Sequence, residues 1–149
     1  MIDPQPYSFS RYLSAKKTVD DRALNRHVWD SLVRQIRSMP APAGIQVLEV
    51  GAGIGTMLER MVEWDALSQA SYLAIDQMAE NIEAANLRLP AWAAARGCQA
   101  RRSAGAWEIA SEQLSLDVHF EQGDVFEFAT RAHAQKWDLL VANAFLDLL

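Results

Sequence analysis

The sequence predicts an α/β fold built on a parallel sheet with helices on both faces. From Ile45 onward, short apolar runs typical of buried strands alternate with stretches of helical periodicity. This alternation indicates parallel strands, because each parallel return needs a crossover that a helix usually supplies. The chain has 149 residues, half of them hydrophobic and 22% charged, which fits one globular domain.

A helical segment is expected before the first strand. Thr18 is typical of a helix N-cap, because Asp21 follows three positions later. Apolar residues then recur at every fourth position, at Leu24, Val28, Leu32 and Ile36. Three chain-breaking residues end the pattern: Pro40, Pro42 and Gly44. We therefore assign residues 1–44 to an N-terminal helical cap segment and residues 45–149 to the core.

Four strands are predicted in this core, at residues 45–50, 71–76, 115–124 and 137–143. Helices are expected behind the first three of them, within residues 57–62, 77–89 and 125–134. Pro90 is expected to break the second of these helices, with a further helical turn or two after it. Residues 99–114 have a poor pattern, and the GAWEIA stretch within them fits a short strand, a helix or an ordered loop equally.

The glycine-rich loop VLEVGAGIGTM is expected at a ligand site, because open α/β sheets bind ligands beyond the carboxyl ends of their strands. Its glycines follow a GxGxG spacing rather than the GxGxxG of dinucleotide-binding loops, and Thr56 stands where the third glycine would be. No lysine follows Gly55 in this loop, which excludes a Walker phosphate loop. Glu49 adds a carboxylate that would repel phosphate, so a cationic ligand such as S-adenosylmethionine fits better.

With these residues in view, the chain resembles the N-terminal part of class I, Rossmann-like S-adenosylmethionine-dependent methyltransferases. The resemblance covers roughly residues 45–149 and implies a partial sheet of about four strands in the order 3-2-1-4. It also implies that S-adenosylmethionine is the cofactor. The first motif of that family corresponds to Glu49, Gly51, Ala52, Gly53 and Gly55, whose backbone would lie along the methionine and ribose of the cofactor.

Further motifs follow in the family's order. Asp76 corresponds to the acid that holds both ribose hydroxyls, and Gln77 and Met78 follow where a residue commonly lies against the adenine face. A core position is an equally good interpretation of Met78, which falls on the apolar face of the expected helix. The resemblance further implies contacts to adenine from Gly123, Asp124 and Val125, and a contact near the methionine end from Asn143.

The family's sheet ordinarily has seven strands, so the core is expected to be truncated after strand 4. We favour a shortened product of a larger methyltransferase over a half-domain that another chain completes. In either case the last strand would carry a bare edge, which predicts a homo-oligomer paired through residues 137–143. Catalytic residues are unknown, because the acceptor side would lie in the absent part or in the N-terminal segment.

Several classes of partner and site are disfavoured. The net charge is −5 and the basic residues are scattered, which argues against nucleic acid. Ala-Phe-Leu-Asp after Asn143 lacks the aromatic clamp of amino-methylating enzymes, so a small-molecule or lipid-like acceptor is expected. His27, His119 and His133 lie on different predicted elements, so no metal site is expected. With one cysteine, no membrane-spanning stretch and no signal peptide, the expected location is the cytoplasm.

The N-terminal segment carries an aromatic and basic cluster before the expected long helix: Tyr7, Phe9, Arg11, Tyr12 and Lys16. In similar enzymes such a segment often folds over the cofactor, while a packing or surface role fits equally well. Two other functions compete with a methyltransferase of small molecules or lipids. One is a catalytically inactive cofactor-binding or scaffold fragment, and the other is a nicotinamide-dependent oxidoreductase, which Glu49 and Thr56 disfavour.

Overall fold

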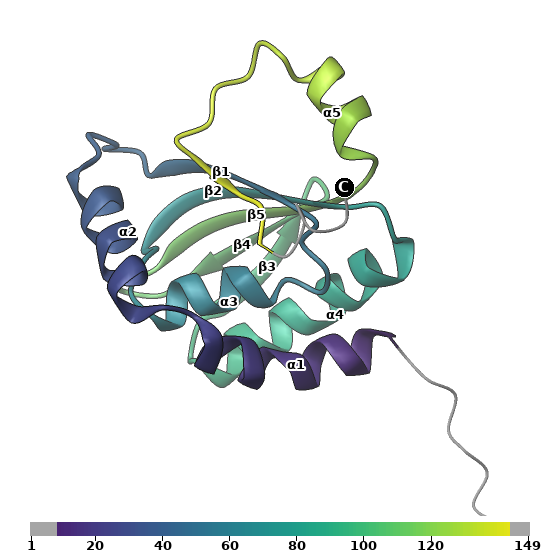
Figure 1. Cartoon of the computed structure of the whole chain (residues 1–149), viewed down its shortest axis with the longest axis horizontal. Helices are drawn as coiled ribbons and strands as arrows, with labels where there is room; N and C mark the ends of the chain where they lie inside the picture. Colours follow the sequence, from purple (N-terminus) through teal and green to yellow (C-terminus); the bar gives the residue numbers. More distant parts are fainter. Residues whose placement is uncertain (1–8, 144–149) are drawn as a thin grey trace, which may run out of the picture.

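The computed structural model describes residues 9–143, with side chains from residue 11 onward, and has the α/β architecture expected from the sequence (Figure 1). Five helices occur in this part of the chain: α1 (Phe9–Ala23), α2 (Arg26–Ser38), α3 (Thr56–Glu63), α4 (Ala79–Ala95) and α5 (Val125–Arg131). Six strands form one sheet: β1 (Ile45–Val50), β2 (Gln69–Asp76), β3 (Gln99–Ser103), β4 (Ala106–Ala110), β5 (Ser115–Gln122) and β6 (Leu139–Val141).

The four parallel strands confirm the predicted order. The sheet runs β3-β4-β5-β2-β1-β6, and β5, β2, β1 and β6 are parallel neighbours. Counted among the four predicted strands alone, this order is 3-2-1-4. Gly44 allows the chain to enter β1, because its φ is +85° and an added Cβ would lie 2.7 Å from the carbonyl oxygen of Gln69. The fold is therefore Rossmann-like.

The stretch left open by the sequence is an antiparallel hairpin that extends the sheet beyond β5. β3 pairs with β4, and β4 pairs with β5. Ala104 and Gly105 form the two-residue turn with φ of +49° and +85°, as the twist of a tight hairpin requires. Trp107 fixes the hairpin to α4, since its indole N–H donates to Oδ1 of Asn86 at 3.0 Å.

The N-terminal helices differ from the sequence prediction. A single helix starting at Thr18 was wrong, because Thr18 lies inside α1 and a break at residues 24–25 separates α1 from α2. Asn25 caps α2, since its side chain accepts hydrogen bonds from the backbone N–H groups of His27 and Val28. Val28, expected in the buried stripe, is 65% exposed.

Pro90 does not break α4, contrary to the sequence prediction. The helix continues to Ala95 although proline removes one backbone donor. Leu89 and Ala93 are buried on the same helix face, and α4 packs against β2, β3 and β5. Burial of this face and the alanine-rich sequence after Pro90 support the continuation.

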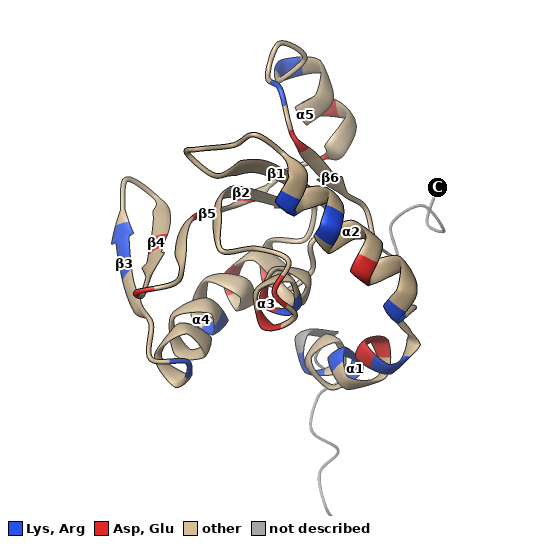
Figure 2. Ribbon diagram, turned by 90° about the vertical axis from the view of Figure 1, so that its left-hand side faces the viewer, with Lys and Arg blue, Asp and Glu red and all other residues tan. Residues whose placement is uncertain are grey.

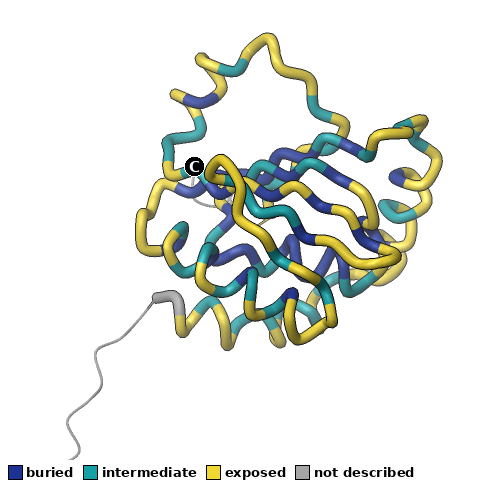
Figure 3. Tube along the Cα trace, turned by 180° about the vertical axis from the view of Figure 1, so that it is seen from behind, coloured by how far each residue is buried: buried dark blue, intermediate teal, exposed yellow. Residues whose placement is uncertain are grey.

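Two apolar clusters of unequal size lie on the two faces of the sheet. The larger lies beneath α3 and α4 and includes Val47, Leu58, Tyr72 and Val118. The smaller lies beneath α5 and consists of Leu48, Val50, Ile75 and Phe128, with partly buried neighbours. Helix α1 forms a further layer outside α3 and α4, on the side of the sheet away from α5 (Figure 1). Buried residues concentrate along the strands and the helix faces that cover them (Figure 3).

The surface mixes both signs of charge. Basic and acidic residues occur together on α1 and on α2, although α2 is mostly basic (Figure 2). None of the helices in the described part of the chain is long and apolar enough to cross a membrane.

Candidate cofactor site

The carboxyl ends of β1, β2 and β5 meet at one edge of the sheet, and hydrogen bonds join the loops that follow them. The backbone N–H of Ala52, in the glycine loop after β1, donates to the carbonyl of Ile75 at 3.0 Å. The N–H of Gly123, after β5, donates to the carbonyl of Asp76 at 3.0 Å. The structure thus brings three of the sequence-predicted motifs into direct contact.

The glycine loop takes a conformation that side chains would oppose. Gly51, Gly53 and Gly55 have φ of +67°, +57° and +85°, in the left-handed region. An added Cβ on Gly55 would lie 3.3 Å from the ring of Phe120, and one on Gly53 would lie 3.3 Å from a methyl of Leu13 in α1. Gly55 also caps α3, so the loop leads directly into a helix N-terminus.

Asp76 holds this loop in place. It ends β2 and is 8% exposed. Its Oδ2 accepts from the backbone N–H of Gly53 at 2.8 Å, while Oδ1 accepts from the N–H of Met78 at 2.9 Å and from the side-chain amide of Asn81 at 3.0 Å. The predicted ribose-binding acid therefore lies at the glycine loop, and three protein donors already orient its carboxylate.

Glu49 occupies a different setting from the one the sequence suggests. Its side chain is 3% exposed and lies in the larger core, where Oε2 accepts from the hydroxyl of Tyr72 at 2.7 Å. Burial raises the pKa of Glu49 to about 8, although the Tyr72 hydrogen bond and the nearby Arg60 act in the opposite direction. At pH 7 the Glu49 side chain is therefore protonated and neutral in most copies of the protein. A neutral Glu49 would not repel phosphate, so the charge of Glu49 no longer argues against a phosphate ligand. Contact of Glu49 with a ligand stays a prediction.

Gln77 and Met78 lie at the surface beside Asp76. The carbonyl of Gln77 accepts from the side-chain amide of Gln122 at 3.3 Å, which adds a further link between the ends of β2 and β5. Met78 is 40% exposed and precedes α4 as its cap residue. The core interpretation of Met78 is therefore wrong, while the adenine-facing interpretation stays a prediction.

The remaining motif residues, Gly123 to Val125 and Asn143, lie at the expected strand ends. Asp124 caps α5, since its Oδ1 accepts from the backbone N–H groups of Phe126 and Glu127 at 2.8 and 3.2 Å. Val125 packs against the cluster that contains Phe128. Asn143 is exposed just beyond β6, the neighbour of β1. Adenine and methionine contacts from these residues stay predictions.

Two buried residues that hydrogen-bond to the candidate site's carboxylates escaped the sequence analysis. Asn81, which donates to Asp76, is 3% exposed, and its own Oδ1 is buried without a partner in the described structure. Tyr72 is 2% exposed and pairs with Glu49. Asn81 lies four residues before Ala85 on the buried face of α4, so an amide at an otherwise apolar helical position was the available signal.

The N-terminal cluster is only partly described. Tyr7 lies outside the described residues, and the side chain of Phe9 is likewise not described. Arg11 and Tyr12 are exposed on α1, and Lys16 lies 3.9 Å from Asp20 in an ion pair. The contact of α1 with the glycine loop comes instead from Leu13, which the sequence analysis did not select.

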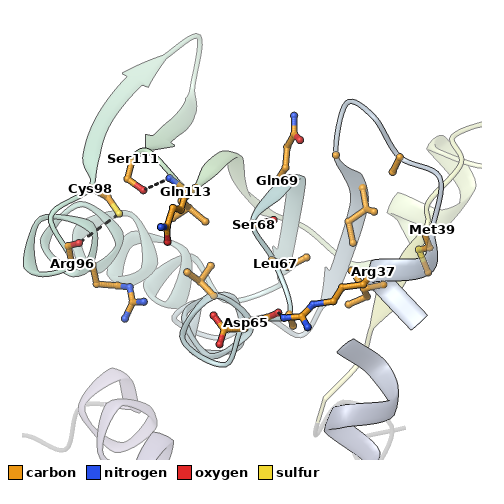
Figure 4. Close-up of a pocket in the computed structure, with 17 residues that line it drawn as sticks. Arg37, Met39, Asp65, Leu67, Ser68, Gln69, Arg96, Cys98, Ser111 and Gln113 are labelled. Carbon is orange, nitrogen blue, oxygen red and sulfur yellow. Dashed lines mark hydrogen bonds between the residues drawn. The ribbon is translucent and has the colours of Figure 1, made fainter. Parts of the chain in front are cut away.

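A cavity of about 550 Å³ lies at the opposite end of the sheet, where β1, β2 and β5 begin. Its lining includes Arg37, Asp65, Gln69, Arg96, Cys98 and Gln113 (Figure 4). Arg37 donates to the carbonyl of Asp65 at 3.3 Å, and Arg96 lies over the ring of Trp92. Arg37 thus contacts the backbone just after α3, and Arg96 contacts the Trp92 ring. The cavity shares no residue with the predicted cofactor contacts.

Comparisons with known proteins give likeness in structure only. No protein-family model and no curated protein sequence matches the chain. Among solved structures, the chain is similar to the plantazolicin methyltransferase BpumL in complex with SAH, with 19% identity, a TM-score of 0.45, and coverage of 95% of this chain and 42% of that protein. It is also similar to the YcgJ protein from Bacillus subtilis, with 19% identity, a TM-score of 0.37, and coverage of 76% and 37%. The chain thus spans less than half the length of both proteins.

Proposed function

We propose that this chain is the cofactor-binding portion of an S-adenosylmethionine-dependent methyltransferase that acts on a small-molecule or lipid-like acceptor. The observation that carries the proposal is the meeting of the glycine loop, Asp76 and Gly123 at the carboxyl edge of a sheet in the order 3-2-1-4. In such sheets this edge is where ligands bind.

The residues at this edge fit a nucleoside-bearing cofactor. The glycine loop carries no side chains at Gly51, Gly53 and Gly55, which lets a ligand approach the backbone closely. Asp76 retains acceptor capacity on Oδ2, which receives one hydrogen bond from the described residues. Asp124 uses Oδ1 to cap α5, which leaves Oδ2 to accept from an amino group of the ligand.

The bound cofactor would supply an electrophilic sulfonium methyl, and the protein's main task would be to align an acceptor with it. The glycine loop and Asp76 would fix the nucleoside. Asn143 would lie toward the acceptor, because it follows β6, next to β1 in the sheet. The net charge of −5 supports an acceptor other than nucleic acid.

Helix α1 would form part of the cover over the cofactor. Its Leu13 already lies against the glycine loop at Gly53. If Arg11 contributes to this cover, Arg11→Ala weakens cofactor affinity, and unchanged affinity removes Arg11 from the cover.

Calorimetric titration of the chain with S-adenosylhomocysteine (SAH) and with NAD tests the proposal. We expect saturable binding of SAH and none of NAD, while binding of NAD alone would overturn it. Asp76→Ala should weaken SAH binding by about tenfold or more, the effect of losing a charge-assisted hydrogen bond. Asp117→Ala is the matched control, because Asp117 is exposed on the neighbouring strand β5 and should leave the affinity unchanged.

A second candidate is a catalytically inactive cofactor-binding or scaffold fragment that needs a further chain. The edge of the sheet at β6 favours it, because β6 pairs with β1 on one side and Leu140 is 63% exposed. This candidate predicts self-association through residues 137–143. Light scattering over a range of concentrations checks it, and a strictly monomeric species throughout would contradict it.

A further inference from the structure

The hydrogen bonds of Asp76 leave the carboxylate little room for a ligand. A carboxylate offers about four acceptor positions, two on each oxygen. Oδ1 uses both of its positions, for the N–H of Met78 and the amide of Asn81. Oδ2 uses one, for the N–H of Gly53. One acceptor position remains, and it lies on Oδ2.

The Asn81 side chain can be oriented in only one way. A carboxylate accepts and does not donate, so the NH₂ of Asn81 faces Asp76 and its carbonyl oxygen faces elsewhere. That oxygen, Oδ1, is buried without a partner in the described structure. The Asn81 amide therefore donates one hydrogen bond to Asp76, while its carbonyl oxygen accepts none. Buried acceptors without a partner are rare in protein interiors.

Packing alone does not account for an amide at this position. The next residues on the same face of α4, Ala85 and Leu89, are apolar and buried. An apolar side chain at position 81 would fill the same kind of space without burying an unpaired oxygen. The hydrogen bond from the Asn81 amide to Asp76 is what distinguishes Asn81 from such a side chain.

We propose that Asn81 is a positioning residue that limits Asp76 to a single open acceptor position, so that the carboxylate holds a ribose through one hydroxyl rather than two. This inference rests on the proposed function, because it concerns how the same site holds the nucleoside. Because Asn81 occupies Oδ1, Asp76 would accept a hydrogen bond only from the ribose hydroxyl nearest Oδ2. The other of the 2′ and 3′ hydroxyls would make no hydrogen bond to Asp76.

Calorimetric titration with SAH and with its 2′-deoxy and 3′-deoxy forms tests the inference on the unmodified chain. We expect one deoxy form to bind about tenfold or more weakly than SAH and the other to bind within about threefold of it. Equal losses of tenfold or more for both deoxy forms would overturn the inference while leaving the proposed function intact. Failure of SAH itself to bind would overturn the proposed function.

Asn81→Leu adds a test of the residue itself, because it keeps the size and removes the donor. Freed Oδ1 would accept the second hydroxyl, so the deoxy form that was tolerated should now bind several-fold more weakly than SAH. A purely structural role would weaken all three ligands by the same factor, and that result would overturn the inference. Asn86→Leu is the control, since Asn86 lies on the same helix and bonds to Ile82 and Trp107 instead; it should leave the ratios unchanged.

Discussion

The two faces of the sheet are covered by different numbers of helix layers, and the difference decides where ionisable side chains are buried. On the side covered by α3 and α4, with α1 outside them, three ionisable side chains are each 3% exposed or less: Glu49 of β1, and Glu59 and Arg60 of α3 itself. The opposite face is covered by α5 through an apolar cluster around Phe128. A double layer of helices provides both the burial and the hydrogen-bond or ion-pair partners that buried ionisable groups need, whereas a single short helix does not.

Ion pairs also attach α1 to this thicker side. Asp21 accepts from Arg60 at 2.5 Å, and Lys17 donates to Glu63 at 2.9 Å. Arg88 of α4 contacts both oxygens of Glu59 and donates to Ser14 of α1 at 2.9 Å. The outer helix is thus attached largely by charged groups, while α5 is attached by apolar packing.

The largest effect is expected from Asp21→Ala. The substitution leaves the guanidinium of Arg60, 1% exposed and with Nη2 already unpaired in the described structure, without its carboxylate. Removing one partner of a buried pair costs about 3–5 kcal/mol. Chemical denaturation measures the loss in the free energy of unfolding. Asp20→Ala is the control, because Asp20 faces Lys16 at 3.9 Å with both side chains about one-third exposed, and it should cost less than about 1 kcal/mol.

On the face of the sheet covered by α5, Phe128→Ala should lower the free energy of unfolding by about 3 kcal/mol, the low end for a buried phenylalanine. Phe128 is 7% exposed and packs against Trp137 with ring centroids 6.4 Å apart. Phe126→Ala on the same helix is the matched control, because Phe126 is 64% exposed. Equal losses for the two variants in denaturation would show that α5 does not cover an apolar cluster.

A smaller effect is expected from pH. Burial raises the pKa of Glu49 to about 8 from its ordinary value of 4.5, so its contribution to stability is fully present below pH 4.5 and is lost as the pH rises through 8. Between pH 6 and pH 8 the loss is about 2 kcal/mol. Asp21 and Glu63 act outside this window. Burial raises the pKa of each, but hydrogen bonds and nearby cations, with the Trp92 indole as a further donor to Glu63, outweigh burial and lower the pKa of Asp21 below 3.8 and that of Glu63 below 4.5. Denaturation of Glu49→Gln should lack this pH dependence, and an unchanged slope would contradict it.

The smallest effect is expected where an ion pair lies on the uncovered part of the sheet. Arg101 and Glu108 lie opposite one another on β3 and β4, 2.5 Å apart, but their side chains are 77% and 45% exposed. Arg101→Ala should cost less than about 0.5 kcal/mol, because solvent screens such pairs. A thermal-unfolding midpoint lowered as far as in Asp21→Ala would contradict the idea that depth of cover governs these pairs.

Sequence patterns predicted the elements whose signals are local. Alternation along Leu116, Val118 and Phe120 predicted β5, and all three side chains are buried. The hairpin was not predictable in this way, because Trp107 anchors it through Asn86, a partner distant in sequence. The break before Asn25 was missed since Thr18 carried an equally good capping signal.

The site was predicted to a similar extent. The spacing of glycines and acids along the chain located Asp76 and the glycine loop, which the structure joins through the Gly53 N–H. The environment of each carboxylate could not be predicted, because it depends on tertiary neighbours. Glu49 of β1 accepts a hydrogen bond from Tyr72 of the neighbouring β2, and Asp76 accepts one from Asn81 of α4.

The antiparallel hairpin gives the sheet two unlike margins. Its β3 margin carries Arg101 and Arg102, with the Arg102 guanidinium over the Trp107 ring, and charged side chains at a margin oppose strand addition. The β6 margin carries the exposed Leu140 instead. Copies that join through β6 would use the same surface twice, and such a pairing closes on itself. The hairpin would thereby favour finite dimers over open-ended fibres.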